Sequence, residues 1–185
     1  MKKTMAAVAV LSMFLAGSAM AQEGKWEASI AGNMTATTTD VGGSSSDTTS
    51  TFVYLRLGQY LSPELVVSGN ISMFGSSSGG GTTSNIGSTF GLGAKYYMEG
   101  AAKSAFVPFV EAEAHAVVIG STVSNVTYTT TGGGFAFGVG GSYFITEDVS
   151  ADVSLQGFAD SLTPDSGASY NQSGVRMLFG LTARY

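Results

Sequence analysis

Residues 106–119 read FVPFVEAEAHAVVI, and this stretch alternates between two kinds of side chain. One set is apolar and runs from Phe106 to Val118 in steps of two, while the other contains Glu111, Glu113 and His115. Side chains that alternate with a period of two point to opposite faces of a β-strand. The stretch therefore predicts a strand with one apolar face and one polar face.

The same alternation recurs along the chain and predicts an all-β protein of eight antiparallel strands. The expected strands cover residues 25–36, 51–60, 65–74, 87–98, 106–119, 134–145, 149–158 and 173–185. Three connections are short, namely 61–64, 99–105 and 146–148. Four are long and polar, namely 37–50, 75–86, 120–133 and 159–172. Short turns at one end and long loops at the other predict an up-and-down barrel.

The composition of the 185 residues excludes several classes of protein. The chain contains 26 Gly, 25 Ser and 19 Thr, and its hydrophobic content of 44% is too high for a disordered chain. It has no Cys, which excludes a disulfide scaffold. The net charge of −5 argues against nucleic acid as a partner.

The first 21 residues have the pattern of a secretory signal peptide. Lys2 and Lys3 precede an apolar run over residues 6–16, and Ala19-Met20-Ala21 provides a small-x-small cleavage site. An uncleaved membrane anchor is the alternative, but the run is shorter than the ~20 residues that a spanning helix needs. We therefore assign residues 1–21 to a signal peptide and residues 22–185 to the β-barrel domain.

The charges indicate which face of the strands is turned inward. All titratable residues within the expected strands fall on the face opposite the apolar one; they are Lys25, Glu27, Arg56, Lys95, Glu111, Glu113, His115, Asp152, Arg176 and Arg184. Only 11% of the chain is charged, whereas about 25% is usual for soluble domains. A narrow polar lumen inside a membrane barrel explains this scarcity. A soluble exported barrel, with the apolar face inside, is the rival interpretation.

Aromatic side chains favour the transmembrane interpretation. Five of them lie on the apolar face near the short turns, as an expected girdle at the membrane interface: Trp26, Tyr96, Phe106, Tyr143 and Tyr185. Met73, Phe90 and Phe135 lie on the same face near the long loops. Aromatic rings at both edges of an apolar band are typical of transmembrane β-barrels.

The end of the chain carries a resemblance to a known family. The alternating stretch from Val175 to Tyr185, with Phe179 and Leu181, resembles the insertion signal of outer-membrane proteins, although most family members end in Phe. Residues 143–152 and 106–114 are similar to the small outer-membrane β-barrel family, which includes OmpA-type membrane domains, OmpX and OmpW-like proteins. The resemblance implies a monomeric eight-stranded barrel in the cell outer membrane. Its implied partners are outer-membrane lipid, lipopolysaccharide and the barrel-assembly machinery.

The charged residues of the lumen are the candidate functional residues. We expect a salt-bridged network of Arg56, Lys95, Glu111, Glu113, His115, Asp152 and Arg176, because partly desolvated carboxylates need cationic partners. Lys95 is the leading expected partner of Glu111, and Arg56 and Arg176 are the candidates across the lumen. A metal site at Glu113 and His115 would lack a second His or an Asp cluster. No Ser stands at a recognisable motif position for catalysis, so we assign no catalytic, metal or cofactor residue.

These observations predict a protein with a structural or cell-surface interaction role rather than an enzyme. Its expected features are a closed polar lumen and four extracellular loops rich in Ser, Thr and Gly. A narrow channel for small or apolar solutes is the first alternative, and it requires a continuous lumen or a lateral opening. A lipid-modifying enzyme is the second, and it requires a reactive Ser or His on the outer face.

Overall fold

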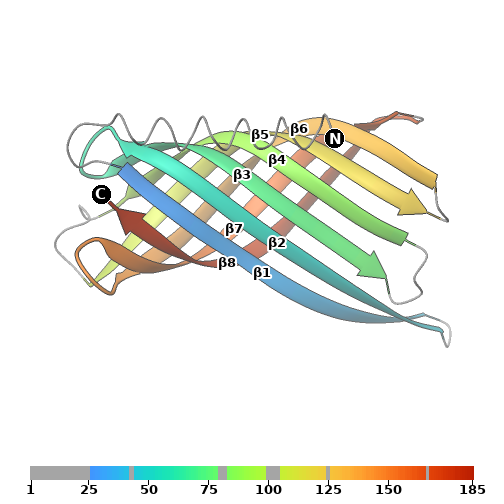
Figure 1. Ribbon diagram of the computed structural model, residues 1–185, viewed down its shortest axis with the longest axis horizontal. Coiled ribbons are helices and arrows are strands. Elements are labelled where there is room, and N and C mark those ends of the chain that lie inside the picture. The colour runs from blue at the N-terminus through green and yellow to red at the C-terminus, as the bar shows by residue number, and fades with distance from the viewer. Residues whose placement is uncertain (1–25, 42–43, 79–82, 99–104, 124–125, 166) are drawn as a thin grey trace.

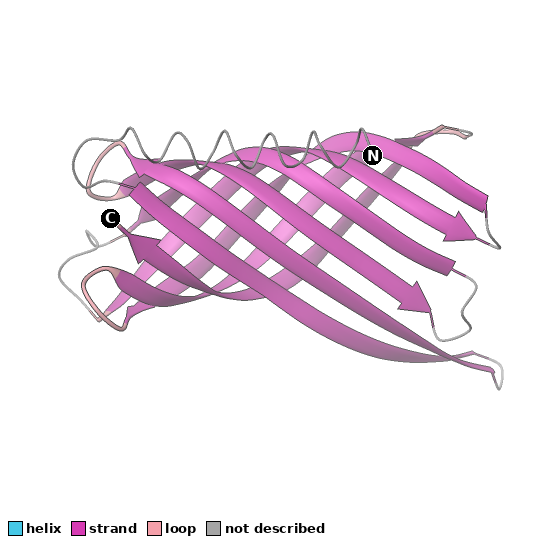
Figure 2. Ribbon diagram, viewed as in Figure 1, coloured by secondary structure: helices cyan, strands magenta, loops and turns pink. Residues whose placement is uncertain are grey.

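The computed structural model describes residues 26–41, 44–78, 83–98, 105–123, 126–165 and 167–185. Eight strands form one closed antiparallel barrel in chain order, as Figures 1 and 2 show. They are β1 (Trp26–Val41), β2 (Ser44–Tyr60), β3 (Leu65–Ser78), β4 (Thr83–Tyr97), β5 (Phe106–Val123), β6 (Val126–Phe144), β7 (Val149–Pro164) and β8 (Tyr170–Arg184). No helix in this part of the chain is long and apolar enough to cross a membrane. The predicted signal peptide and Lys25 lie outside the described residues.

The prediction of eight antiparallel strands in an up-and-down barrel is confirmed, but the predicted strand lengths are wrong. The strands have 14 to 19 residues, and they continue through most of the four stretches expected to be long loops. In one such stretch, β1 and β2 stay paired as far as Val41↔Ser44, and in another β5 and β6 stay paired as far as Val123↔Val126. Hydropathy alternation ends where the side chains become uniformly polar, whereas backbone pairing continues and Thr suits a strand. The long loops are therefore extended hairpins with short tips.

The barrel closes with a stagger between its first and last strands. A row of paired residues that starts at Ala28 and passes through all eight strands arrives at Ser173, whereas Ala28 pairs directly with Ala183. Ser173 and Ala183 lie ten residues apart along β8. Such a stagger requires the strands to tilt, and Figure 1 shows them inclined to the long axis of the barrel.

The seam between β1 and β8 is shorter than the other seven ladders. It has six pairs, between residues Glu27–Gly32 and Phe179–Arg184, whereas each other ladder has 13 or more. At the short-turn end, Trp26 and Tyr185 extend it with backbone hydrogen bonds of 2.9 and 3.0 Å. The seam is thus closed at the short-turn end and unpaired towards the hairpin end.

The two faces of the wall differ as the alternation predicts. The outer face carries the large exposed apolar side chains, such as Leu92 at 72% and Phe135 at 72% exposure. Of the predicted girdle, Tyr96, Phe106, Tyr143 and Tyr185 are exposed and Trp26 is partly buried. The inner face carries buried polar and charged side chains; they include Glu27, Arg56, Lys95, Glu111, Glu113 and His115. The apolar face is therefore outside, as in a membrane protein.

We predict that Leu92→Arg or Val153→Arg lowers the free energy of unfolding by about 2–4 kcal/mol, because each places a charge within the apolar outer band. Thr131→Arg, on the outer face nearer the hairpin end, is the matched control and is expected to cost about 0–1 kcal/mol. Unfolding titrations in lipid vesicles measure all three variants. Equal costs at Leu92 and Thr131 would contradict the placement of the apolar band.

Candidate functional site: the polar network of the lumen

Glycines on β6 allow side chains of β5 and β7 to meet across the intervening strand. Gly138 pairs with Glu111 on one side and with Gln156 on the other. A Cβ atom at Gly138 would lie 2.8 Å from Gln156 Cγ and 2.9 Å from Glu111 Oε1. Gly134 lies in the same way between His115 and Asp160. The missing side chains create the space through which the polar network crosses the lumen.

The centre of the network is an ion pair between β2 and β5. Arg56 Nη2 lies 2.5 Å from Glu111 Oε2, and both side chains are about 95% buried. Gln156 Nε2 donates to Glu111 Oε1 at 2.5 Å, and Arg176 Nε donates to Gln156 Oε1 at 2.8 Å. The chain of bonds therefore connects β2, β5, β7 and β8, and it spans the lumen from wall to wall.

The expected ion pair between Lys95 and Glu111 is wrong. The two residues are cross-strand neighbours, as the register requires, yet Lys95 Nζ donates to Asp152 Oδ2 at 3.1 Å. Asp152 also accepts hydrogen bonds from Thr182 at 2.6 Å and Ser150 at 2.8 Å. Arg56 reaches Glu111 from across the lumen, so Lys95 is left to pair with the carboxylate of β7.

His115 lies between two carboxylates near the hairpin end of the network. Its Nε2 is 2.8 Å from Asp160 Oδ1, and its Nδ1 is 3.3 Å from Glu113 Oε1. Glu113 Oε2 accepts hydrogen bonds from Tyr54 at 2.7 Å and Asn70 at 3.0 Å. An imidazole with a carboxylate at each nitrogen can donate to both only in its doubly protonated form.

A second polar cluster seals the short-turn end beside the seam. Glu27 Oε2 accepts hydrogen bonds from Tyr60 at 3.0 Å and Tyr97 at 2.9 Å. Arg184 Nε donates to the Tyr60 hydroxyl at 2.6 Å and lies 4.0 Å from Glu27. Because Glu27 and Arg184 are a direct pair of the β1–β8 ladder, this cluster ties the two ends of the barrel together.

Aromatic rings inside the lumen were missed by the sequence analysis. The Lys95 ammonium lies 4.1 Å from the centre of the Phe109 ring, and the Arg176 guanidinium lies 4.2 Å from that of Phe52. Such cation–π contacts stabilise a charge that water no longer reaches. The sequence pattern could have placed both rings in the lumen. Phe52 lies four residues from Arg56 on β2 and Phe109 lies two residues from Glu111 on β5, so each ring shares a face with a lumen charge of its own strand.

The lumen is filled at the level of the Arg56–Glu111 pair. A cavity of about 30 Å³ remains there, lined by residues including Arg56, Lys95, Glu111 and Asp152. This volume has room for about one or two water molecules. In the described part of the chain, no group of three or more His, Asp or Glu side chains is arranged to hold a metal ion.

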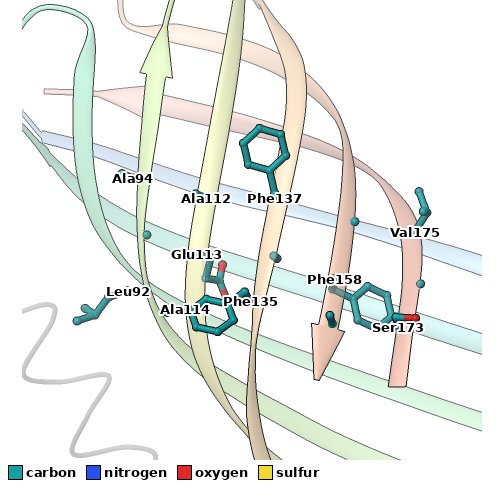
Figure 3. Close-up of a pocket in the computed structure, with 15 residues that line it drawn as sticks. Leu92, Ala94, Ala112, Glu113, Ala114, Phe135, Phe137, Phe158, Ser173 and Val175 are labelled. Carbon is teal, nitrogen blue, oxygen red and sulfur yellow. The ribbon is translucent and has the colours of Figure 1, made fainter. Parts of the chain in front are cut away.

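An open hollow lies on the outer surface of the wall across β4 to β8, and its lining is predominantly apolar. It measures about 1050 Å³ and surrounds Phe135 and Phe137, which stand between the small side chains of β5 and β7 (Figure 3). On β5 these are Ala112 and Ala114, and on β7 they are Gly157 and Ala159. The Phe135 and Phe137 rings therefore protrude from the outer surface, and the small residues on either side leave shallow grooves beside them.

Comparisons with known proteins agree with this geometry. Residues 6–180 match the model of the family described as outer membrane protein beta-barrel domain. The chain belongs to this family. It is a protein of the cell outer membrane, and the resemblance found in the sequence is confirmed. No curated protein sequence matches the chain.

Several solved structures share the fold. Neisserial surface protein A has a TM-score of 0.61 at 14% identity, covering 89% of this chain and 100% of its own. The N-terminal β-barrel domain of Pseudomonas aeruginosa OprF has a TM-score of 0.54 at 15% identity, covering 88% and 100%. OprG from the same organism has a TM-score of 0.52 at 13% identity, covering 89% and 97%. At these identities the likeness shows the fold alone.

We predict that Gly138→Ala lowers the free energy of unfolding by about 1–3 kcal/mol, because the added methyl group forces Glu111 and Gln156 apart. Gly157→Ala is the matched control on the neighbouring strand. A Cβ atom there would meet no other atom closer than 4.0 Å, so this variant is expected to be neutral or slightly stabilising. Denaturant titration of both variants in lipid vesicles measures the difference. Equal stabilities would show that the network does not need the space at Gly138.

Proposed function

We propose that this outer-membrane barrel has a structural and cell-surface interaction role and is neither an enzyme nor a wide pore. The observation that carries the proposal is the row of side chains across the lumen, where Arg56, Glu111, Gln156 and Arg176 form a continuous chain. A passage for solutes would require these buried ion pairs to separate. Breaking a buried ion pair leaves an uncompensated charge, which costs about 3–5 kcal/mol.

The four extended hairpins are the surface through which we expect the protein to meet its surroundings. Residues 37–50, 75–86, 120–133 and 159–172 contain no Lys or Arg and are rich in Ser, Thr and Gly. Their charged residues are all acidic, namely Asp40, Asp47, Asp160 and Asp165. Hydroxyl groups without basic residues beside them suit contacts with the sugars of lipopolysaccharide better than contacts with its phosphates. Lipopolysaccharide and outer-membrane lipid are accordingly the proposed partners of the folded barrel.

The C-terminal strand supports a proposed role in assembly. Phe179, Leu181 and Tyr185 are exposed on the outer face of the barrel end, with exposures of 60%, 52% and 52%. An apolar strand that ends on an aromatic residue suits recognition by the barrel-assembly machinery during insertion. The mature barrel then acts as a monomer, and residues 1–21 serve as its export signal.

The alternative of a lipid-modifying enzyme is disfavoured by the position of its candidate residue. The His115 side chain is 3% exposed and faces the lumen, between two carboxylates. A lipid substrate would approach from the outer face, where the apolar side chains lie. The buried imidazole therefore fits a structural bond between β5 and β7.

We predict that the protein shows no large, steady conductance in planar lipid bilayers, because the Arg56–Glu111 pair crosses a narrow lumen. The double variant R56A/E111A removes both side chains and is expected to conduct more than the wild type. Single-channel recording compares the conductance of the wild type and of R56A/E111A, with the same amount of protein added to the bilayer. A large, steady conductance of the wild type would refute the closed lumen.

A further inference from the structure

Arg176 is a lumen cation without a carboxylate partner. Arg56, Lys95 and Arg184 each lie within 4.0 Å of a carboxylate, but in the part of the chain that the structure describes Arg176 does not. Its Nε donates to the neutral amide of Gln156, and its guanidinium lies over the rings of Phe52 and Phe158. Arg176 is therefore a lumen cation that no carboxylate contacts directly, although Glu113, Asp160 and Glu111 attract it at longer range.

The terminal nitrogens of Arg176 remain available to a ligand. Among the described residues they have no hydrogen-bond acceptor, and they are not among the side-chain nitrogens that are sealed from solvent. The neighbouring carboxylates bond elsewhere, because Glu113 Oε2 accepts from Tyr54 and Asn70 while Asp160 Oδ1 bonds to His115. A guanidinium edge with free donors suits an oxyanion, which it can bind through two parallel hydrogen bonds.

The unpaired half of the β1–β8 seam lies beside this charge. The ladder ends at Gly32↔Phe179, three residues from Arg176 along β8. Asn33 makes one further contact across the seam, a 3.1 Å hydrogen bond from Nδ2 to the Met177 carbonyl. Towards the hairpin end from this contact, residues 170–173 of β8 are exposed on both faces of the strand. These residues are paired with β7, but no ladder pair joins them to β1.

The opening begins within the apolar outer band. Met177 and Val175, on the unpaired part of β8, are exposed on the outer face at 49% and 69%. A molecule that enters here meets apolar side chains outside the wall and a cation just inside it. Unpaired backbone groups are also costly in lipid, so a polar ligand group at this edge would stabilise it.

We propose that the β1–β8 opening and Arg176 form a binding site for an anionic amphiphile. In this site an oxyanion head group, carboxylate or phosphate, binds the Arg176 guanidinium, and an apolar chain leaves through the opening along Val175 and Met177. The site lies on the hairpin side of the Arg56–Glu111 chain, so binding needs no passage through the closed part of the lumen.

Calorimetric titration of the full chain in phosphatidylcholine nanodiscs tests the site, with empty nanodiscs subtracted. We expect laurate to bind saturably, with one molecule per barrel. Dodecanol has the same chain without the charge, and acetate and inorganic phosphate have the charge without the chain; each is expected to bind at least tenfold more weakly. Equal binding of laurate and dodecanol would overturn the proposal, and equal binding of laurate and a short anion would exclude the amphiphile.

Variants locate the bound group. R176Q is expected to weaken laurate binding at least tenfold. R176K retains the positive charge and is expected to retain most of the laurate affinity. K95Q removes a lumen cation that already has a carboxylate partner, so it is the matched control and is expected to bind laurate like the wild type. Laurate binding that R176Q leaves unchanged would refute the site. If R176Q does not fold, the comparison of laurate with dodecanol on the wild type decides whether the anionic head group contributes to binding.

A crosslink tests the route of the chain. The protein has no Cys, so M34C/M177C introduces the only two thiols, each two residues beyond the last ladder pair of its strand. The oxidised form is expected to lose laurate binding, and the reduced form of the same variant, which is its own control, is expected to retain it. Unchanged binding after oxidation would contradict entry through the seam.

Discussion

The ion pair between Arg56 and Glu111 is the interaction on which the interior of this barrel depends. Two charges removed from water are stable only when each meets the other and the remaining polar atoms are bonded. Glu111 satisfies this condition through Arg56 and Gln156, and the second contact exists because Gly138 carries no side chain. The position of a glycine on β6 therefore decides whether charges on β2, β5 and β7 can share one network.

The polar lumen and the apolar exterior follow from the same division of residues. Long polar side chains point inward from β2, β5 and β7, where glycines of β4 and β6 leave room for them, while Leu92, Phe135 and their neighbours face the membrane. Arg176 differs from the other cations because its nearest polar partner is the neutral Gln156. It is also the lumen cation that stands beside the unpaired part of the seam, and for this reason we propose the ligand site there.

Period-two alternation was sufficient to predict the strand number, the closed antiparallel topology and the face of every described charge within the expected strands. It missed Asp160, the lumen partner of His115, because residues 159–172 were expected to form a polar loop. It could not decide between the candidate partners of Glu111, because Lys95 is its neighbour in the ladder whereas Arg56 reaches it from the opposite wall. It also missed Phe52 and Phe109, since a search for polar residues on the inner face overlooks rings of the same parity. The long hairpins were read as loops because Ser and Thr end the hydropathy pattern without ending the backbone pairing. The short β1–β8 seam depends on the stagger of the whole barrel and has no local signal.

A double-mutant cycle of Arg56→Ala and Glu111→Ala, measured as free energy of unfolding in lipid vesicles, shows whether the two side chains stabilise each other. Each single variant is expected to lose about 3–5 kcal/mol, because each leaves one buried charge without its partner. The double variant is expected to lose less than the sum of the two single losses, since both charges are then gone. Strictly additive losses would show that Arg56 and Glu111 do not depend on each other and would refute the ion pair as the basis of the lumen network.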